Sequence, residues 1–293
     1  MDAIIDYFGA KRILVEPDCP MAKAYKVGIM ASTGAIISFL DDDDIYAHNK
    51  LEEVLKAFTD DPTVSYFRHN VAFIDKDGKP IRKVEREHLR AFRDHKLKIK
   101  NVTRHLSFLR ISGAAFNLSS ISIRKSILEP YLGNLQEAFN ICSDGFQLAA
   151  VLASGNTIYL SRKFLGFYRK HPQSTSRSLG GTFEAKTRAA RINNRFYGDV
   201  ELISRFFDTP NVSIFMYYQT TCFAVNSKIG VIRGKSLQSN VSDAFDLRKT
   251  IKAALLAMDP ILLYDLGRYF LNTLIFCPIL RGKIHNYGEI ATR

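Results

Sequence analysis

Four consecutive aspartates, Asp41 to Asp44, stand in the stretch SFLDDDDIYAHNK at residues 38–50, directly after an apolar run. Bringing four negative charges together costs repulsion energy, so a compensating group is expected. Hard divalent cations such as Mg2+ and Mn2+ prefer carboxylate oxygens, and they bind a substrate diphosphate at the same time. An Asp before the helix that begins near His48 would also be favoured by the helix dipole, which accounts for one or two of the acids. The cluster therefore predicts a site for a divalent cation and a diphosphate.

The segments around the four acids have the lengths and apolar spacing of an α/β sheet. Residues 35–40, AIISFL, form an unbroken apolar run, which is typical of a strand buried on both faces. Open α/β sheets bind their ligands at the carboxyl end of such strands. The neighbouring patterns predict strands at residues 11–16 (KRILVE) and 63–75 and helices at residues 21–32 and 49–62. This alternation indicates a sheet with parallel character.

The second half of the chain changes from mixed to helical patterns. Residues 112–131 read as a strand followed by a short helix, and residues 143–156 as a helix that opens on Ser143 or Asp144 and closes at Gly155. A strand is expected after Gly155. Helical patterns then cover residues 183–207, 211–229 and 243–280, the last interrupted at Pro260. We expect an α/β domain at residues 1–178 and a helical region at residues 179–293.

The composition favours an anionic partner and a reducing compartment. The net charge of +12 suggests a phosphate-bearing substrate or an acidic membrane surface. No aromatic and basic stripe of a nucleic-acid-binding module accompanies it, so no nucleic-acid partner is predicted. The four cysteines are widely spaced, without a CxxC pair, which is compatible with the cytoplasm. The basic and aromatic tail also fits a peripheral contact at the inner face of the cell membrane.

Residues 21–58 resemble the central block of family 2 glycosyltransferases, which have the GT-A fold. The shared positions are Gly28-Ile29, Thr33-Gly34, Ile37, Phe39-Leu40-Asp41, Asp43-Asp44 and Lys50-Leu51-Glu52. The resemblance implies a mixed, mostly parallel sheet flanked by helices, with Asp41 and Asp43 as a D-x-D pair. Asp43 would be the direct metal ligand and Asp41 would lie near the ribose or the metal's water shell. The cofactor would be Mn2+ or Mg2+, holding the diphosphate of a nucleotide-sugar donor.

Residues 140–176 resemble a second family segment, E-D-x-x-L followed by Y-R-x-H-x-x-S. The resemblance places the catalytic base at Asp144, although the pattern of the residues also fits a helix N-cap at this position. It places Arg169 and His171 in a loop beside the donor, where either residue could touch phosphate or lie on the surface. Residues 112–116 resemble the strand on the acceptor side.

The resemblance also has departures. The family's opening strands, which bind the base and ribose, have no counterpart here, and roughly 45 residues of sheet are expected to be missing. The family's A-R-N-x-G reads Ala24 to Gly28 in this chain, where Lys26 keeps a positive charge near the expected diphosphate. The function implied is metal-dependent, inverting transfer of a sugar to a hydroxyl of a glycan or lipid-linked acceptor. The alternative is a non-catalytic, degenerate relative that binds glycans or phosphate-bearing ligands.

Overall fold

The computed structural model describes residues 7, 9–16, 19–81, 93–133, 135, 143–171, 183–232, 245–257, 262–264, 266–267 and 269–271. Its α/β half contains six strands: β1 (Ile36–Ser38), β2 (Ile45–Tyr46), β3 (Val64–Ile74), β4 (His95–Lys98), β5 (Ile121–Arg124) and β6 (Thr157–Arg169). The α-helices of this half are α2 (Met21–Ala31), α3 (Lys50–Asp60), α5 (Leu106–Ile111), α6 (Lys125–Leu128) and α7 (Ser143–Ser154). Short 3-10 turns are described at Val102–His105, Leu118–Ser120 and Glu129–Tyr131. The helical half contains α8 (Phe183–Phe206), α9 (Pro210–Ile232) and α11 (Leu247–Ala257).

The strands form one mixed sheet in the order β1-β5-β3-β6-β2, with β4 pairing to β6. Of the described pairs, β3–β6 is parallel and the other four are antiparallel, so the sheet is less parallel than the sequence suggests. The physical reason is the position of β5, which lies antiparallel between β1 and β3 and keeps these two like-directed strands apart. The mixed α/β class itself, with flanking helices, is confirmed.

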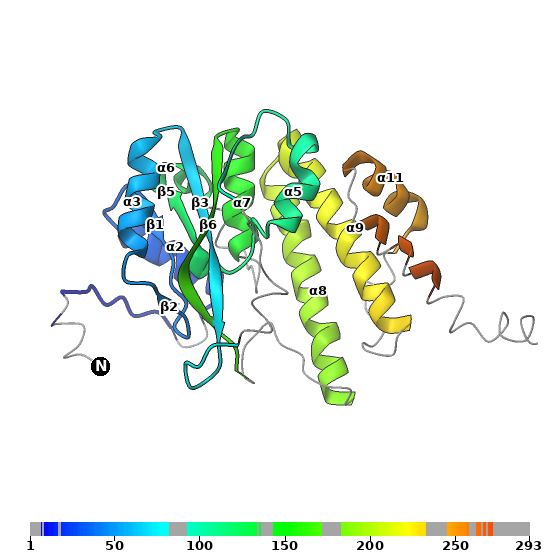
Figure 1. The fold of residues 1–293 in the computed structure, drawn as a ribbon, viewed down its shortest axis with the longest axis horizontal. Coiled ribbons are helices and arrows are strands. Elements are labelled where there is room, and N and C mark those ends of the chain that lie inside the picture. Colours follow the sequence, from blue (N-terminus) through cyan, green and yellow to red (C-terminus); the bar gives the residue numbers. More distant parts are fainter. Residues whose placement is uncertain are drawn as a thin grey trace, which may run out of the picture.

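Helices cover both faces of this sheet (Figure 1). Helix α3 lies on one side, where Val54, Ala57 and Phe58 pack with Phe67 and Leu165 in a small core. Helix α7 lies on the other side, and its residues 148–152 are fully buried. This second side belongs to a large hydrophobic core that also includes residues of α8, α9 and α11. The sheet is therefore fixed from two directions, which holds its strand ends in place.

Most elements predicted from the sequence are found within a few residues of their expected ends, including the strands at β1, β3 and β6 and the helices at α2, α3 and α7. Gly155, expected to end α7, has the left-handed φ of 67° that suits a glycine after a helix. The predicted strand at residues 11–16 is wrong: this segment is exposed and irregular, because no described strand pairs with it. Cys142 and Cys277 lie outside the described residues.

The predicted boundary near residue 178 is crossed by the large core, because Phe207 of the helical half stacks at 5.1 Å from Phe146 of α7 and 4.4 Å from Tyr131. The domain division itself stays a prediction. No helix in the described parts of the chain combines the length and the apolar character needed to cross a membrane.

Candidate active site

The four acids form a turn between β1 and β2 that is held by one backbone hydrogen bond within it and one to Ser119. The Asp41 N–H donates to Ser119 Oγ at 2.9 Å, and the Asp44 N–H donates to the Asp41 carbonyl at 3.2 Å. Asp44 is buried, Asp41 and Asp43 are partly buried, and Asp42 is exposed. The four carboxyls therefore have four different environments, although the sequence presents them as one run.

Asp44 is the acid that fixes the turn to the rest of the sheet. Its carboxyl accepts the Arg169 N–H at 2.9 Å on one oxygen and Asn117 Nδ2 at 2.8 Å on the other. Burial raises the pKa of Asp44, and these hydrogen bonds act against that rise. Because the Asp44 side chain is buried and both of its oxygens are hydrogen-bonded, it stabilises the turn and is not placed to bind a ligand.

Asp43 lies beside the two residues that the sequence placed in the donor loop. Its carboxylate Oδ2 lies 3.0 Å from Nε2 of His171. Its carbonyl accepts Nε of Arg169 at 2.8 Å, and the same guanidinium donates through Nη1 to the carbonyls of Asp75 and Lys76, both at 3.1 Å. The structure thus brings Asp43, Arg169 and His171 together, and Arg169 joins the turn to the end of β3.

Asp41 lies on the other side of the turn, next to α2. Tyr25 of α2 donates its hydroxyl to Asp41 Oδ1 at 3.3 Å. Burial, followed by the charge of Asp44, raises the pKa of Asp41 from its ordinary 3.8 to about 6. A carboxyl kept this close to other acids gains from a positive charge placed nearby. Lys26, the next residue of α2, is partly exposed and makes no hydrogen bond or ion pair with other described residues, so its role at the diphosphate stays a prediction.

Asp144 lies in the first turn of α7, partly buried, with its carboxyl close to the acidic turn. It accepts the Gly145 N–H at 2.8 Å and a backbone hydrogen bond from Asn117. Burial is the main cause that raises the pKa of Asp144 to about 7, and the negative charge of Asp41 adds to it. Because α7 begins at Ser143, Asp144 lies inside the first turn, and its contact with the next residue is not the N2 or N3 hydrogen bond of an N-cap side chain. The raised pKa is of the kind found in general bases.

Asn117 connects the two acidic centres and was not singled out by the sequence. Its side chain binds Asp44 and its backbone N–H binds Asp144. Its φ of 61° makes it the non-glycine residue with a left-handed backbone among those described. Such a conformation costs energy, and it persists where the surrounding contacts require it. The proposed acceptor segment, residues 112–116, leads directly into this position.

Lys50 supports the same region from the start of α3. Its side chain is fully buried, donates to the Ser119 carbonyl at 2.6 Å and lies 3.6 Å above the Tyr46 ring. Burial lowers the pKa of Lys50 to about 7, and the charge of Asp44 acts against that decrease. The sequence signal for Lys50 was its place in the Lys-Leu-Glu motif, whereas Tyr25, Asn117 and Ser119 carried none, since their contacts come from distant segments.

The oxygen ligands of the acidic turn suit Mn2+ or Mg2+ if substrate phosphates complete the coordination. Among the described residues, no group of three or more His, Cys, Asp or Glu side chains is arranged to hold a metal alone. Mg2+ is commonly bound by one or two carboxylates together with substrate phosphates, so a pair of acids is sufficient. Asp41 and Asp43 supply hard oxygen ligands in an acid-rich turn whose Asp41 has a raised pKa. These residues fit such a cation.

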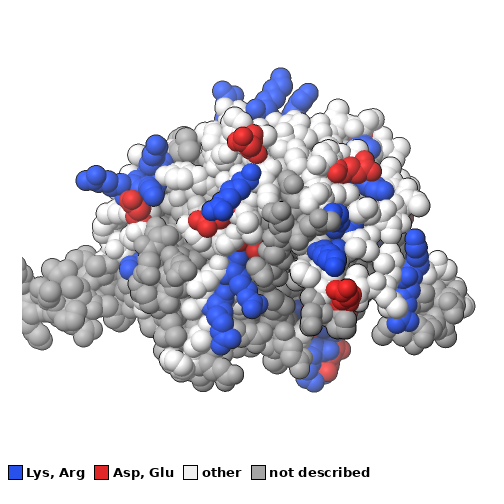
Figure 2. Space-filling model, turned by 180° about the vertical axis from the view of Figure 1, so that it is seen from behind, with Lys and Arg blue, Asp and Glu red and all other residues white. Residues whose placement is uncertain are grey.

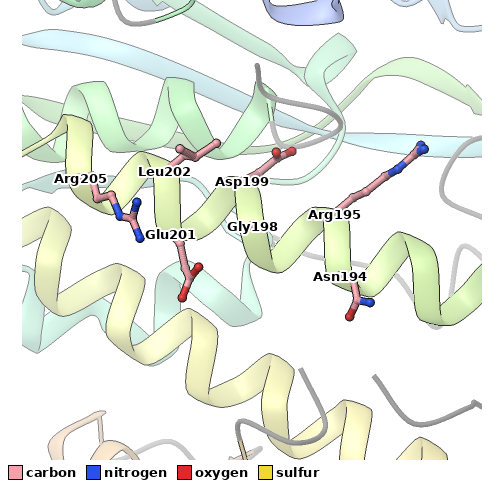
Figure 3. A pocket seen from close by; sticks show the side chains of 7 residues that line it. All are labelled: Asn194, Arg195, Gly198, Asp199, Glu201, Leu202 and Arg205. Carbon is pink, nitrogen blue, oxygen red and sulfur yellow. The ribbon is translucent and has the colours of Figure 1, made fainter. Parts of the chain in front are cut away.

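An open hollow of about 390 Å3 lies elsewhere, along α8. It is lined by Asn194, Arg195, Gly198, Asp199, Glu201, Leu202 and Arg205. Figure 3 shows Arg195 and Asp199 on one side of the helix and Asn194 and Glu201 on the opposite side. The polar groups therefore diverge, and this hollow lacks the converging groups of a binding site.

Residues 16–122 match the family described as glycosyl transferase family 2. Over these residues, the chain is similar to glycosyltransferase family 2. The family match contains the acidic turn and ends within β5, so Asp144, Arg169 and His171 lie beyond it.

The chain is also similar to one curated protein and to one solved structure. An uncharacterized glycosyltransferase of Nostoc sp., alr2836, is 24% identical over 180 residues, which is 60% of this chain and 53% of that protein. The chain thus spans about half the length of this curated relative. The crystal structure of S. aureus TarS 1-349, in complex with UDP, matches 92% of this chain and 75% of its own, with a TM-score of 0.48 and 13% identity.

Proposed function

We propose that this chain is a family 2 glycosyltransferase, which transfers a sugar from a nucleotide-diphosphate donor to a hydroxyl group of a glycan or lipid-linked acceptor, with inversion at the anomeric carbon. The observation that supports this most is the link through Asn117, which joins the acidic turn to a partly buried carboxyl whose pKa is about 7. A donor site and a base within one network suit a reaction with two substrates. The UDP in the TarS complex belongs to that protein and suggests the class of donor to test first.

Each residue has a defined task in this proposal. The acceptor hydroxyl attacks the anomeric carbon, its proton passes to the Asp144 carboxylate, and the bond from that carbon to the diphosphate oxygen breaks. Asp41 and Asp43 would hold Mn2+ or Mg2+, which supplies positive charge for the diphosphate when bound. Arg169 and Lys26 add positive charge around the donor, and His171 orients Asp43. Asp44 keeps the turn in place.

The setting of the reaction is also part of the proposal. We infer a cytoplasmic location, supported by the spacing of the cysteines, with a peripheral contact at the inner face of the cell membrane. The net charge of +12 supports an anionic partner of this kind.

Titration calorimetry with Mn2+ and a panel of UDP-, GDP- and dTDP-sugars tests donor binding. Asp43→Ala should weaken metal-dependent binding by about 10- to 100-fold, the range seen when support of a metal is lost. Asp42→Ala is the matched control, because it removes an exposed carboxyl from the same turn. Asp144→Asn should leave donor binding intact and lower turnover by about 100-fold or more. Absence of any donor binding would favour the non-catalytic alternative, and full turnover in Asp144→Asn would remove Asp144 as the base.

A further inference from the structure

Helix α11 divides cleanly into a buried face and an exposed face. Thr250, Ala253 and Ala254 are buried where the helix packs against α9. The opposite face exposes Ile251 and Leu255, one helical turn apart, and Leu255 is 69% exposed. An isolated exposed leucine is ordinary, whereas aligned apolar residues on one helix indicate a surface that is covered by something.

The helical residues after α11 extend this apolar surface. Leu263, Tyr264, Phe270 and Leu271 are exposed, and Tyr264 is 66% exposed. The ring of Tyr269 lies 4.6 Å from that of Phe245, two residues before α11 begins, so the segment returns to the start of the helix. Figure 1 shows these pieces together at the end of the molecule away from α3. We name the exposed side chains of α11 and of residues 263–271 the α11 surface.

The charged residues of α11 itself are all basic, and Asp246, one residue before the helix, is partly exposed. Arg248, Lys249 and Lys252 are exposed beside Ile251 and Leu255, and the residues of α11 include no acid. Figure 2, which views the molecule from behind, shows Lys and Arg side chains at the end where α11 lies, with an acidic side chain beside them, and further basic side chains spread over this face. Helix α3 offers a contrast, since it exposes Leu51 and Leu55 but carries Glu52, Glu53 and Asp60 among them.

We propose that the α11 surface docks this protein on an anionic lipid bilayer. Apolar side chains flanked by Lys and Arg are the features by which amphipathic helices lie in the membrane interface. The apolar groups enter the boundary of the acyl chains, and the basic groups remain among anionic headgroups. A neutral or basic partner would leave Arg248, Lys249 and Lys252 without complementary charge. The proposal rests on the membrane contact of the proposed function and names the surface that makes it, whereas it does not depend on sugar transfer, because this surface is remote in sequence from the acidic turn.

Vesicle co-sedimentation of the full chain tests the proposal without any sugar donor. The protein should sediment with vesicles of phosphatidylcholine and phosphatidylglycerol, bind vesicles of phosphatidylcholine alone weakly, and dissociate in high salt. Lys252→Glu and Leu255→Gln should each weaken binding by about fivefold or more. The matched controls are Lys56→Glu and Leu55→Gln on α3, whose parent side chains are similarly exposed. Circular dichroism confirms that each variant is folded.

Three results would overturn the proposal. The first is a folded chain that does not sediment with anionic vesicles. The second is equal weakening by the α3 and α11 variants. The third is a dimer, seen by light scattering without lipid and broken by Leu255→Gln, because it would show that a second copy of the chain covers this surface.

Discussion

At the scale of single residues, the candidate site is governed by carboxyls that burial and mutual repulsion make reluctant to ionise. Burial, followed by the charge of Asp44, raises the pKa of Asp41 to about 6, and burial, with a smaller effect of Asp41, raises the pKa of Asp144 to about 7, while hydrogen bonds oppose both shifts only in part. A positive charge bound between the turn and α7 would favour ionisation of both. The free protein therefore holds the Asp144 carboxyl partly protonated near neutral pH.

A pH titration should make this state visible. The folded protein keeps a proton on Asp144 between the ordinary pKa of 3.8 and about 7, whereas the unfolded chain releases it. Because the folded state binds more protons in this window, the contribution of Asp144 to stability falls as pH rises from about 4 to about 7. Asp144→Asn should remove this part of the pH dependence of urea unfolding. Carbon NMR of the aspartate carboxyls should show a titration near pH 7 that the variant lacks.

Two further variants separate the effect of Asp144 from that of other carboxyls. Asp208→Asn changes an exposed carboxyl of the helical half and serves as the matched control. Asp41→Asn should bring the pKa of Asp144 down, since it removes a neighbouring negative charge. An Asp144 carboxyl that titrates near its ordinary 3.8 in the folded, metal-free protein would contradict the prediction.

The sequence could predict the site residues that stand in compact motifs. Asp43, Arg169 and His171 were named from two short segments, and the structure joins them. Asn117 and Ser119 could not be found in this way, because their importance comes from contacts with Asp41, Asp44 and Asp144 across the fold. The sequence does not distinguish an asparagine with a left-handed backbone from any other asparagine in a turn.

At the scale of elements, the segment from residue 112 to residue 120 connects α5 to β5 and carries the link between the two acidic centres. Asn117→Gly removes the donor to Asp44 but accepts a φ of 61° without strain, whereas Asn117→Ala removes the donor and adds strain. Both variants should lose about 1–3 kcal/mol of unfolding free energy with the hydrogen bond. The alanine variant should lose about 1 kcal/mol more than the glycine variant. Urea unfolding of both measures the difference.

Equal stabilities of Asn117→Gly and Asn117→Ala would show that this backbone is not held in the left-handed region. Asn117→Asp is the further control, because aspartate tolerates the same φ but places a negative charge against Asp44. It should be the least stable of the three at neutral pH and recover as the pH falls. That ordering separates the effect of the side chain from that of the backbone.

The sheet shows where element prediction succeeds and where it stops. The apolar runs of β1 and β3 and the amphipathic pattern of α3 are local properties, and the sequence located all three. The order β1-β5-β3-β6-β2 depends on pairings between distant segments, which no local pattern records. Residues 11–16 have strand-like composition but no neighbouring strand, and a strand without a partner leaves its backbone groups unpaired.

At the scale of the whole molecule, the helical half is joined to the α/β half by packing and hydrogen bonds. Asn211 of α9 accepts the Val102 N–H at 3.0 Å and donates to the Leu152 carbonyl at 3.4 Å. Phe207 lies fully buried against Phe146 and Tyr131. The helical half therefore covers the core on the α7 side of the sheet and shields it from solvent.

This continuity predicts a single cooperative unfolding transition for the whole chain, followed equally by tyrosine fluorescence and by circular dichroism. Phe207→Ala should lower the unfolding free energy by about 3–5 kcal/mol, because it opens a cavity between the halves, and both probes should shift together. Phe183→Ala is the matched control on α8, since that ring is exposed. Two separate transitions in Phe207→Ala, with the sheet melting as in the parent protein, would mean that the halves fold as independent units. One shared transition would mean that the helical half is required to cover α7, and with it the helix that begins at Asp144.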